Sequence, residues 1–499
     1  MPRRIRLFVG CLFLVIANYV EHISCFAVER RNVLFIMVDD LRPSLGCFGD
    51  LVAKTPHIDR LAREGRLFEG AYCMQAVCGP SRAAILTGRL PDNTRVWHNR
   101  HRFRESDPGL VTLPQHLKNH GFHTVSLGKI FSGDESELDP ISWSEPEVLR
   151  QKSWKNSVSP KQSDGKGQAW EVADVDDEAY PDGKLASLAI EKLQALAGGD
   201  KAFMLAVGFF KPHLPFNAPK KYWDLIESDR LLELNGSIMS SVIDAPAEAY
   251  HTHRELGGYR GIPRDENVDK PTAITLRHGY YACVAYVDAQ IGRLLDALEA
   301  TGLSESTMVI LCGDHGYSLG EQNRWCKGTN FECDTRVPLI IRYPGLPQGG
   351  VKTSAFVELV DLYPTIIQWV GIDQPRNLDG QSLMPILLNP QAEGRDAVLS
   401  QFSRPFKPGE PKIMGYSLRT HRNRYTRWID WHDRTVISEE LYRYADTEES
   451  RRRGANWFEQ RNLVHDEDQV ERVQELRERL DKMLRMRVNR FASVNEETK

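Results

Sequence analysis

The sequence predicts an α/β fold with a large, mostly parallel sheet flanked by helices, followed by a smaller antiparallel sheet with a helix. Continuous apolar runs, typical of parallel strands buried on both faces, occupy residues 32–38, 123–127, 203–207 and 307–311. Helical stretches lie between these runs, and strands that alternate with helices form parallel sheets. After Pro385 the pattern changes to short strand-like runs, typical of an antiparallel sheet.

The 499 residues are enough for one large and one smaller domain, and we place the boundary between residues 385 and 386. In the first domain, residues 275–300 carry the longest helical periodicity and Gly302 ends it. Residues 132–182 are polar and lack periodicity, which indicates a long surface loop. In the second domain, 386–499, we expect strands at 396–401, 416–419 and 425–429 and a charged helix at 467–486.

The first 27 residues are typical of an export signal. Three arginines precede an apolar run at 7–20, and Cys25-Phe26-Ala27 supplies small residues at the two positions that a signal peptidase inspects. We expect cleavage after Ala27 and export to a periplasmic, extracellular or lysosome-like compartment. An uncleaved anchor is the alternative, but the run is shorter than the roughly 20 residues of a membrane span and is interrupted by Asn18. We therefore expect no stable membrane insertion.

Charge and cysteine content narrow the function classes. The formal net charge of −4 gives no global positive field, which disfavours nucleic acid as a partner. Export permits disulfides, but an odd number of cysteines remains after the signal, so at least one is unpaired. A bridge between Cys326 and Cys333 is left open. The mature chain keeps Cys47, Cys73, Cys78, Cys283, Cys312, Cys326 and Cys333.

Polar side chains follow the four predicted strands. The carboxyl ends of parallel strands meet at one edge, where open α/β sheets bind their ligands, so we expect these side chains to converge. Their carboxylates offer the hard oxygen ligands that Ca²⁺ or Mg²⁺ requires. The polar segments are Asp39-Asp40, Gly128-Lys129, Lys211-Pro212-His213 and Gly313-Asp314-His315.

The most specific motif is Cys78-Gly-Pro-Ser-Arg82, followed by Thr87-Gly-Arg89. It resembles the signature of type I sulfatases of the alkaline-phosphatase superfamily. The resemblance implies an alkaline-phosphatase-like fold and oxidation of Cys78 to formylglycine by a formylglycine-generating enzyme. The hydrated aldehyde is the family's nucleophile, and it attacks sulfur.

The resemblance extends to the remaining site residues. It implies a divalent ion, Ca²⁺ rather than Mg²⁺, and cations around the sulfate, where negative oxygens repel a nucleophile unless positive charge compensates. The guanidinium fork of Arg82 matches two sulfate oxygens, and lysines act there as point charges. The implied catalytic residues are Cys78, Arg82, Lys129, His213 and Lys327, and the implied metal ligands are Asp39, Asp40, Cys78, Asp314 and His315.

Within the family, several segments resemble iduronate-2-sulfatases, which implies a sulfated carbohydrate substrate, first of all 2-O-sulfated uronic acid residues of glycosaminoglycan-like chains. These segments are 209–216, 325–327, 415–420 and the Asp314-His315 pair. One departure stands out. Ser132 replaces the histidine that follows the lysine motif in that branch and is thought to act as a base, which leaves His213 and His315 as candidates for the task.

Two other functions remain open from the sequence. One is a phosphonate monoester or phosphodiester hydrolase of the same superfamily, some of which also use formylglycine. The other is a non-catalytic glycan-binding relative, suggested by Ser132.

Overall fold

The computed structural model describes residues 30–131, 138–148, 167–233, 241–251, 255–264, 267–444 and 459–489. The predicted export signal and Ser132 lie outside these ranges. None of the helices in these ranges combines the length and the apolar character of a membrane span.

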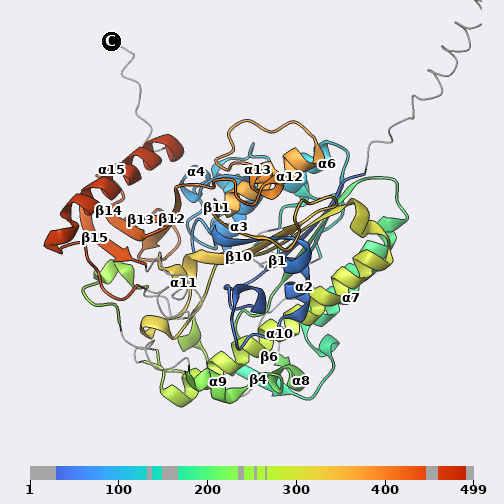
Figure 1. Cartoon of the computed structure of the whole chain (residues 1–499), viewed down its shortest axis with the longest axis horizontal. Helices are drawn as coiled ribbons and strands as arrows, with labels where there is room; N and C mark the ends of the chain where they lie inside the picture. Colours follow the sequence, from blue (N-terminus) through green and yellow to red (C-terminus); the bar gives the residue numbers. More distant parts are fainter. Residues whose placement is uncertain are drawn as a thin grey trace, which may run out of the picture.

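A seven-stranded sheet forms the centre of the molecule (Figure 1). Its strand order is β11-β2-β10-β7-β1-β5-β3. All neighbouring pairs are parallel except those of β10, which runs antiparallel to both β2 and β7. The strands are β1 (Asn32–Val38), β2 (Arg66–Tyr72), β3 (His123–Gly128), β5 (Phe203–Phe209), β7 (Thr307–Gly313), β10 (Arg336–Arg342) and β11 (Lys352–Glu358).

Helices cover both faces of this sheet, as Figure 1 shows. Successive side chains of a strand point to opposite faces. Leu34 and Ile36 of β1 accordingly pack in the core beneath α2, α7 and α10, while Val33 and Phe35 pack in the core beneath α3, α6 and α12. The helices are α2 (Pro56–Glu64), α3 (Cys78–Thr87), α6 (Leu113–Asn119), α7 (Pro181–Ala197), α10 (Lys270–Ala300) and α12 (Leu362–Val370).

The C-terminal part is a separate four-stranded antiparallel sheet with a helix packed on it, at the left of Figure 1. Its strands follow one another in chain order. The predicted sheet and helix are therefore present, with a fourth strand that the sequence analysis did not identify. The elements are β12 (Ala397–Arg404), β13 (Ile413–Thr420), β14 (Asn423–Asp430), β15 (Val436–Arg443) and α15 (Val470–Arg487).

Shorter elements complete the chain. The predicted loop at 132–182 is described only in part, and there it contains a short strand and the start of α7, so it is not wholly irregular. The shorter strands and helices of the whole described chain are β4 (Trp170–Ala173), β6 (Phe216–Pro219), β8 (Ser318–Leu319), β9 (Trp325–Cys326), α4 (Pro91–Thr94), α5 (Phe103–Ser106), α8 (Lys220–Trp223), α9 (Ser228–Glu233), α11 (Glu332–Thr335) and α13 (Met384–Leu388).

The seven cysteines of the predicted mature chain are all free. Cys326 and Cys333, whose bridge the sequence left open, are both buried thiols. Tyr317 lies beside the first of them, with its hydroxyl 3.4 Å from Cys326 Sγ. The structure thus contains no disulfide among these residues.

Candidate active site

Strand register brings the predicted polar side chains together. The last residue of β1, Val38, pairs with Gly313 of β7, so Asp39 and Asp314 lie side by side just beyond the strands. On the other side of β5, Lys129 follows the end of β3. These three residues therefore share the carboxyl edge of the sheet, as the sequence predicted.

Cys78 is the first residue of α3 and lies among these side chains. Its Sγ is 3.4 Å from Asp39 Oδ1, 3.3 Å from His315 Nε2 and 3.4 Å from Lys129 Nζ. Burial and the negative charge of Asp39 raise the pKa of the Cys78 thiol well above its usual value. The predicted nucleophile precursor is thus a buried thiol in contact with an acid, a base and an ammonium group.

Arg82, one turn further along α3, joins two of the carboxylates. Its Nε lies 2.8 Å from Asp314 Oδ2 and its Nη2 lies 3.2 Å from Asp39 Oδ1, while Nη1 donates to the Lys129 carbonyl. The side chain is fully buried. The guanidinium fork that was expected to face sulfate therefore faces Asp39 and Asp314, because a buried guanidinium needs carboxylate and carbonyl partners.

Asp39 also forms an ion pair with Lys129, whose Nζ is 2.5 Å from Asp39 Oδ2. Burial acts to raise the pKa of Asp39, but the positive charges around it, that of Lys129 first, together outweigh burial, and the pKa lies well below its usual range. Burial likewise acts to lower the pKa of Lys129, but the negative groups around it, Asp39 first, together raise it above the ordinary value. The two groups therefore form a charged pair.

Asp40 is held in a left-handed backbone conformation, with a φ of 59°. Its amide donates to Asp314 Oδ1 and its carbonyl accepts from the Tyr280 hydroxyl. Asp40 Oδ1 is buried and accepts no hydrogen bond, although Lys327 Nζ lies 3.1 Å from it. Burial raises the pKa of this carboxyl. A buried carboxylate oxygen without a hydrogen bond is costly unless a cation lies beside it, and the Lys327 ammonium is one such cation.

His315 completes the group of ligand atoms. Its Nδ1 donates to the Gly316 carbonyl at 2.9 Å, so Nε2 is the nitrogen that faces Asp40 and Asp314, 3.5 Å from a carboxylate oxygen of each. Two groups of side chains offer atoms that could bind a metal ion, and within each group these atoms lie within 4.8 Å of one another. The first group is Asp39, Cys78, Asp314 and His315, and the second is Asp39, Asp40 and His213. The predicted residues therefore fit a divalent cation that prefers oxygen ligands.

His213 and Lys327 lie on the other side of Asp40. His213 Nε2 is 3.9 Å and Lys327 Nζ 3.1 Å from its carboxylate. The backbone before His213 is anchored by Asp182, which accepts the amides of Phe210 and Lys211 at 3.0 and 2.8 Å. The structure thus brings all the predicted site residues into one connected cluster.

Glu255 is a member of this cluster that the sequence analysis missed. Its carboxylate lies 3.1 Å from His213 Nε2 and 2.8 Å from Lys327 Nζ. Burial acts to raise the pKa of Glu255, but the charges of Lys327 and His213 lower it well below its usual range. No strand end or motif marks this acid in the sequence, so only tertiary structure identifies it.

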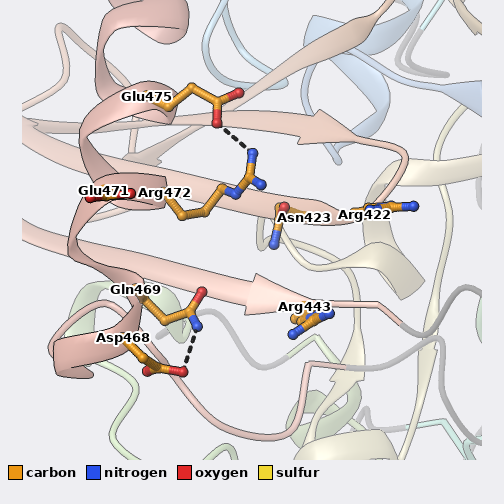
Figure 2. Close-up of a pocket in the computed structure, with 8 residues that line it drawn as sticks. All are labelled: Arg422, Asn423, Arg443, Asp468, Gln469, Glu471, Arg472 and Glu475. Atoms are coloured by element: carbon orange, nitrogen blue, oxygen red, sulfur yellow. Dashed lines mark hydrogen bonds and ion pairs between the residues drawn. The ribbon is translucent and has the colours of Figure 1, made fainter.

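A different cavity, of about 330 Å³, lies between the C-terminal sheet and α15 (Figure 2). Arginines and acids line it together, and Arg472 is paired with Glu475. None of the predicted site residues lines this cavity. The cluster around Cys78, where acids, cations and the signature meet, is therefore the candidate active site.

A family model described as Sulfatase matches residues 31–372, which span every residue of this cluster. The chain belongs to the sulfatase family. A second model, N-sulphoglucosamine sulphohydrolase, C-terminal, matches residues 320–486. This sulfatase is 34% identical over 475 residues to iduronate 2-sulfatase of Mus musculus, which covers 81% of this chain and 85% of that protein. The chain is accordingly a sulfuric ester hydrolase.

Solved structures with the same fold include a phosphonate monoester hydrolase from Silicibacter pomeroyi, with a TM-score of 0.74 and 24% identity over 93% of this sulfatase and 97% of that chain. A 2-O GAG sulfatase has a TM-score of 0.66 and 21% identity over 93% and 94% of the two chains. At these identities the likeness establishes the alkaline-phosphatase-like fold alone.

Proposed function

We propose that the protein is an exported sulfatase that removes sulfate from sulfated sugars, with 2-O-sulfated uronic acid residues of glycosaminoglycan-like chains as its substrate. We further propose that a formylglycine-generating enzyme converts Cys78 to formylglycine. The observation that carries the proposal is the place of Cys78, in contact with Asp39, Lys129 and His315 at the carboxyl edge of the sheet.

Asp39, Asp40, Asp314 and His315 would hold the divalent ion, together with residue 78. The oxygen ligands and the buried Asp40 Oδ1 without a hydrogen bond support this assignment. We propose Ca²⁺, with Mg²⁺ as the second choice, because Ca²⁺ accepts more ligands and a less regular geometry. Such an ion would supply positive charge to the sulfate oxygens.

The remaining residues have complementary tasks. Formylglycine would supply a hydroxyl that attacks sulfur. Lys129 Nζ, 3.4 Å from Cys78 Sγ, and Lys327 Nζ are placed to compensate the charge of sulfate oxygens. His213 Nδ1 donates to the Leu214 carbonyl at 2.7 Å, so Nε2 is the atom from which a proton can reach the leaving sugar oxygen. Arg82 holds Asp39 and Asp314 in place.

The C-terminal part, which we propose to extend from residue 386 to 499, completes the substrate pocket. Arg404 of β12 donates from Nη2 to the carbonyl of Gly328, the residue after Lys327, at 3.0 Å. Asn330 donates to the carbonyl of Gly415 in β13 at 3.1 Å. Substrate contacts from this sheet would therefore be fixed relative to Lys327.

The uronate assignment draws on the name of the Mus musculus relative, and sulfate release tests it. Protein co-expressed with a formylglycine-generating enzyme is assayed on a 2-O-sulfated uronate disaccharide, with an aryl sulfate as maturation control and a phosphodiester as competitor substrate. We expect the wild-type protein to release sulfate from the disaccharide and the Cys78→Ala variant to release none. If the aryl sulfate alone is cleaved, the sugar assignment is wrong. Faster phosphodiester turnover favours the alternative of a phosphonate monoester or phosphodiester hydrolase, and a phosphonate monoester hydrolase shares this fold.

A further inference from the structure

Glu255 lies at the open side of the site. The side chains of Arg82, Asp40 and His315 are 0% exposed. Exposure rises to 7% for Lys327 and 9% for His213, and reaches 14% for Glu255. Glu255 is therefore more accessible to solvent than the buried acids of the cluster.

Glu255 shares its partners with the proposed sulfate site. One carboxylate oxygen contacts His213 and the other contacts Lys327, and both side chains also face Asp40. This pairing compensates the charge of Glu255, which would otherwise repel an anionic ester. It leaves lone pairs on both oxygens, because each carboxylate oxygen accepts more than one hydrogen bond.

A carboxylate in this position suits a sugar hydroxyl. If sulfate oxygens contact Lys327 and His213, the ring carbon that bears the ester lies against the same two side chains. The hydroxyl on the neighbouring ring carbon is then the substrate group nearest to Glu255. A hydroxyl donates well to an ionised carboxylate, and such bonds are about twice as strong as neutral ones.

We propose that Glu255 is a specificity-determining residue whose carboxylate accepts a hydrogen bond from the sugar hydroxyl next to the scissile sulfate ester. This inference rests on the proposed function, since it requires a sulfated sugar as substrate. It explains why an acid stands in a site that must otherwise attract anions. The hydrogen bond also favours sugar sulfates over aryl sulfates as substrates, because aryl sulfates carry no such hydroxyl.

The test compares kcat/KM of two proteins on two substrates. Matured wild type and Glu255→Gln are each assayed on the 2-O-sulfated uronate disaccharide and on its analogue that lacks the neighbouring hydroxyl. For wild type we expect kcat/KM to be about 10- to 100-fold lower on the deoxy analogue, the usual range for a hydrogen bond to a charged group. For Glu255→Gln we expect this ratio to fall several-fold below that of wild type, because a neutral amide oxygen replaces the charged acceptor.

Controls separate this role from a structural one. Glu321→Gln removes another buried carboxylate, 2.7 Å from Arg42 and outside the cluster, and is expected to leave the ratio between the two substrates as in wild type. Thermal unfolding checks that each variant is folded, and Glu255→Ala provides a second variant with the same expected loss of discrimination. If Glu255→Gln lowers kcat/KM on both substrates by the same factor, or on neither, Glu255 does not recognise the hydroxyl and the inference is wrong. If wild type cleaves the aryl sulfate but neither disaccharide, the proposed substrate fails and the inference falls with it.

Discussion

At the scale of single residues, the partners of Arg82 could not be predicted from the sequence. The signature marks it as a cation for sulfate, and the structure shows it fully buried between Asp39 and Asp314. A motif gives the residue type that a site requires, but its partners follow from tertiary packing. Asp39 and Asp314 were predicted because they directly follow parallel strands whose register places them side by side. Glu255 follows no strand, so this reasoning did not identify it.

Removal of the Arg82 charge should destabilise the protein. We expect Arg82→Gln to lower the free energy of unfolding by roughly 3–5 kcal/mol, because breaking a buried pair leaves carboxylates uncompensated. The measurement is urea unfolding in the presence of a chelator, so that a bound cation does not mask the loss. As a control, Arg60→Gln breaks an exposed pair with Asp296 and should cost less than about 1 kcal/mol. Equal losses in the two variants would contradict the assigned role of Arg82.

At the scale of elements, the four strands with continuous apolar runs were predicted close to their observed bounds. Three strands of the same sheet were not. In β2, Arg66, Glu69 and Gly70 interrupt the apolar pattern, and Arg66 is buried because its guanidinium donates to backbone carbonyls. The antiparallel direction of β10 also leaves no local signal, since it depends on the path of the chain between β7 and β10.

Close packing of β3 on β5 fixes Lys129. A Cβ at Gly208 would overlap the backbone carbonyl of Lys129, whose amide donates to the Gly208 carbonyl at 2.8 Å. We expect Gly208→Ala to lower kcat/KM on an aryl sulfate by at least about 100-fold, because small displacements of positioning groups carry a cost of that size. Gly198→Ala is the matched control, since a Cβ there meets nothing closer than 3.8 Å. Turnover of Gly208→Ala equal to that of Gly198→Ala would show that the position of Lys129 is not critical.

At the scale of the whole molecule, the C-terminal sheet is joined to the central domain through buried charge. Glu332 of α11 lies 3.0 Å from Arg419 Nε of β13 and 2.7 Å from Arg424 Nη2 of β14, and it accepts from the Tyr72 hydroxyl. The change of composition after Pro385 predicted a second unit. The two arginine contacts, however, join residues 87 and 92 positions apart, and no sequence pattern marks them. The sequence thus predicted the two parts and not the junction between them.

This junction should make stability depend on pH. Burial acts to raise the pKa of Glu332, but Arg419 and Arg424 lower it from 4.5 to about 2. The unfolded state therefore binds the proton more tightly, so the stabilisation is complete above about pH 4.5 and is lost as pH falls toward 2. We expect Glu332→Gln to lower the free energy of unfolding by roughly 3 kcal/mol at pH 7 and by less than about half of that at pH 3.

The measurement is urea unfolding of wild type and variant at several pH values between 7 and 3. Glu475→Gln serves as control, because its ion pair with Arg472 is exposed on α15 and should contribute less than about 1 kcal/mol at any pH. A difference between wild type and Glu332→Gln that stays constant with pH would show that Glu332 is not held as a carboxylate by the two arginines.

The central claim is that Cys78 is the precursor of the nucleophile in this site. The most direct test combines mass spectrometry of the peptide that contains residue 78 with sulfate release by the same preparation, over a series of co-expressions that give increasing maturation. We expect a peptide with the lower mass of the aldehyde form, and turnover proportional to its fraction. Full turnover by protein in which residue 78 is still a thiol would show that Cys78 is not the precursor of the nucleophile.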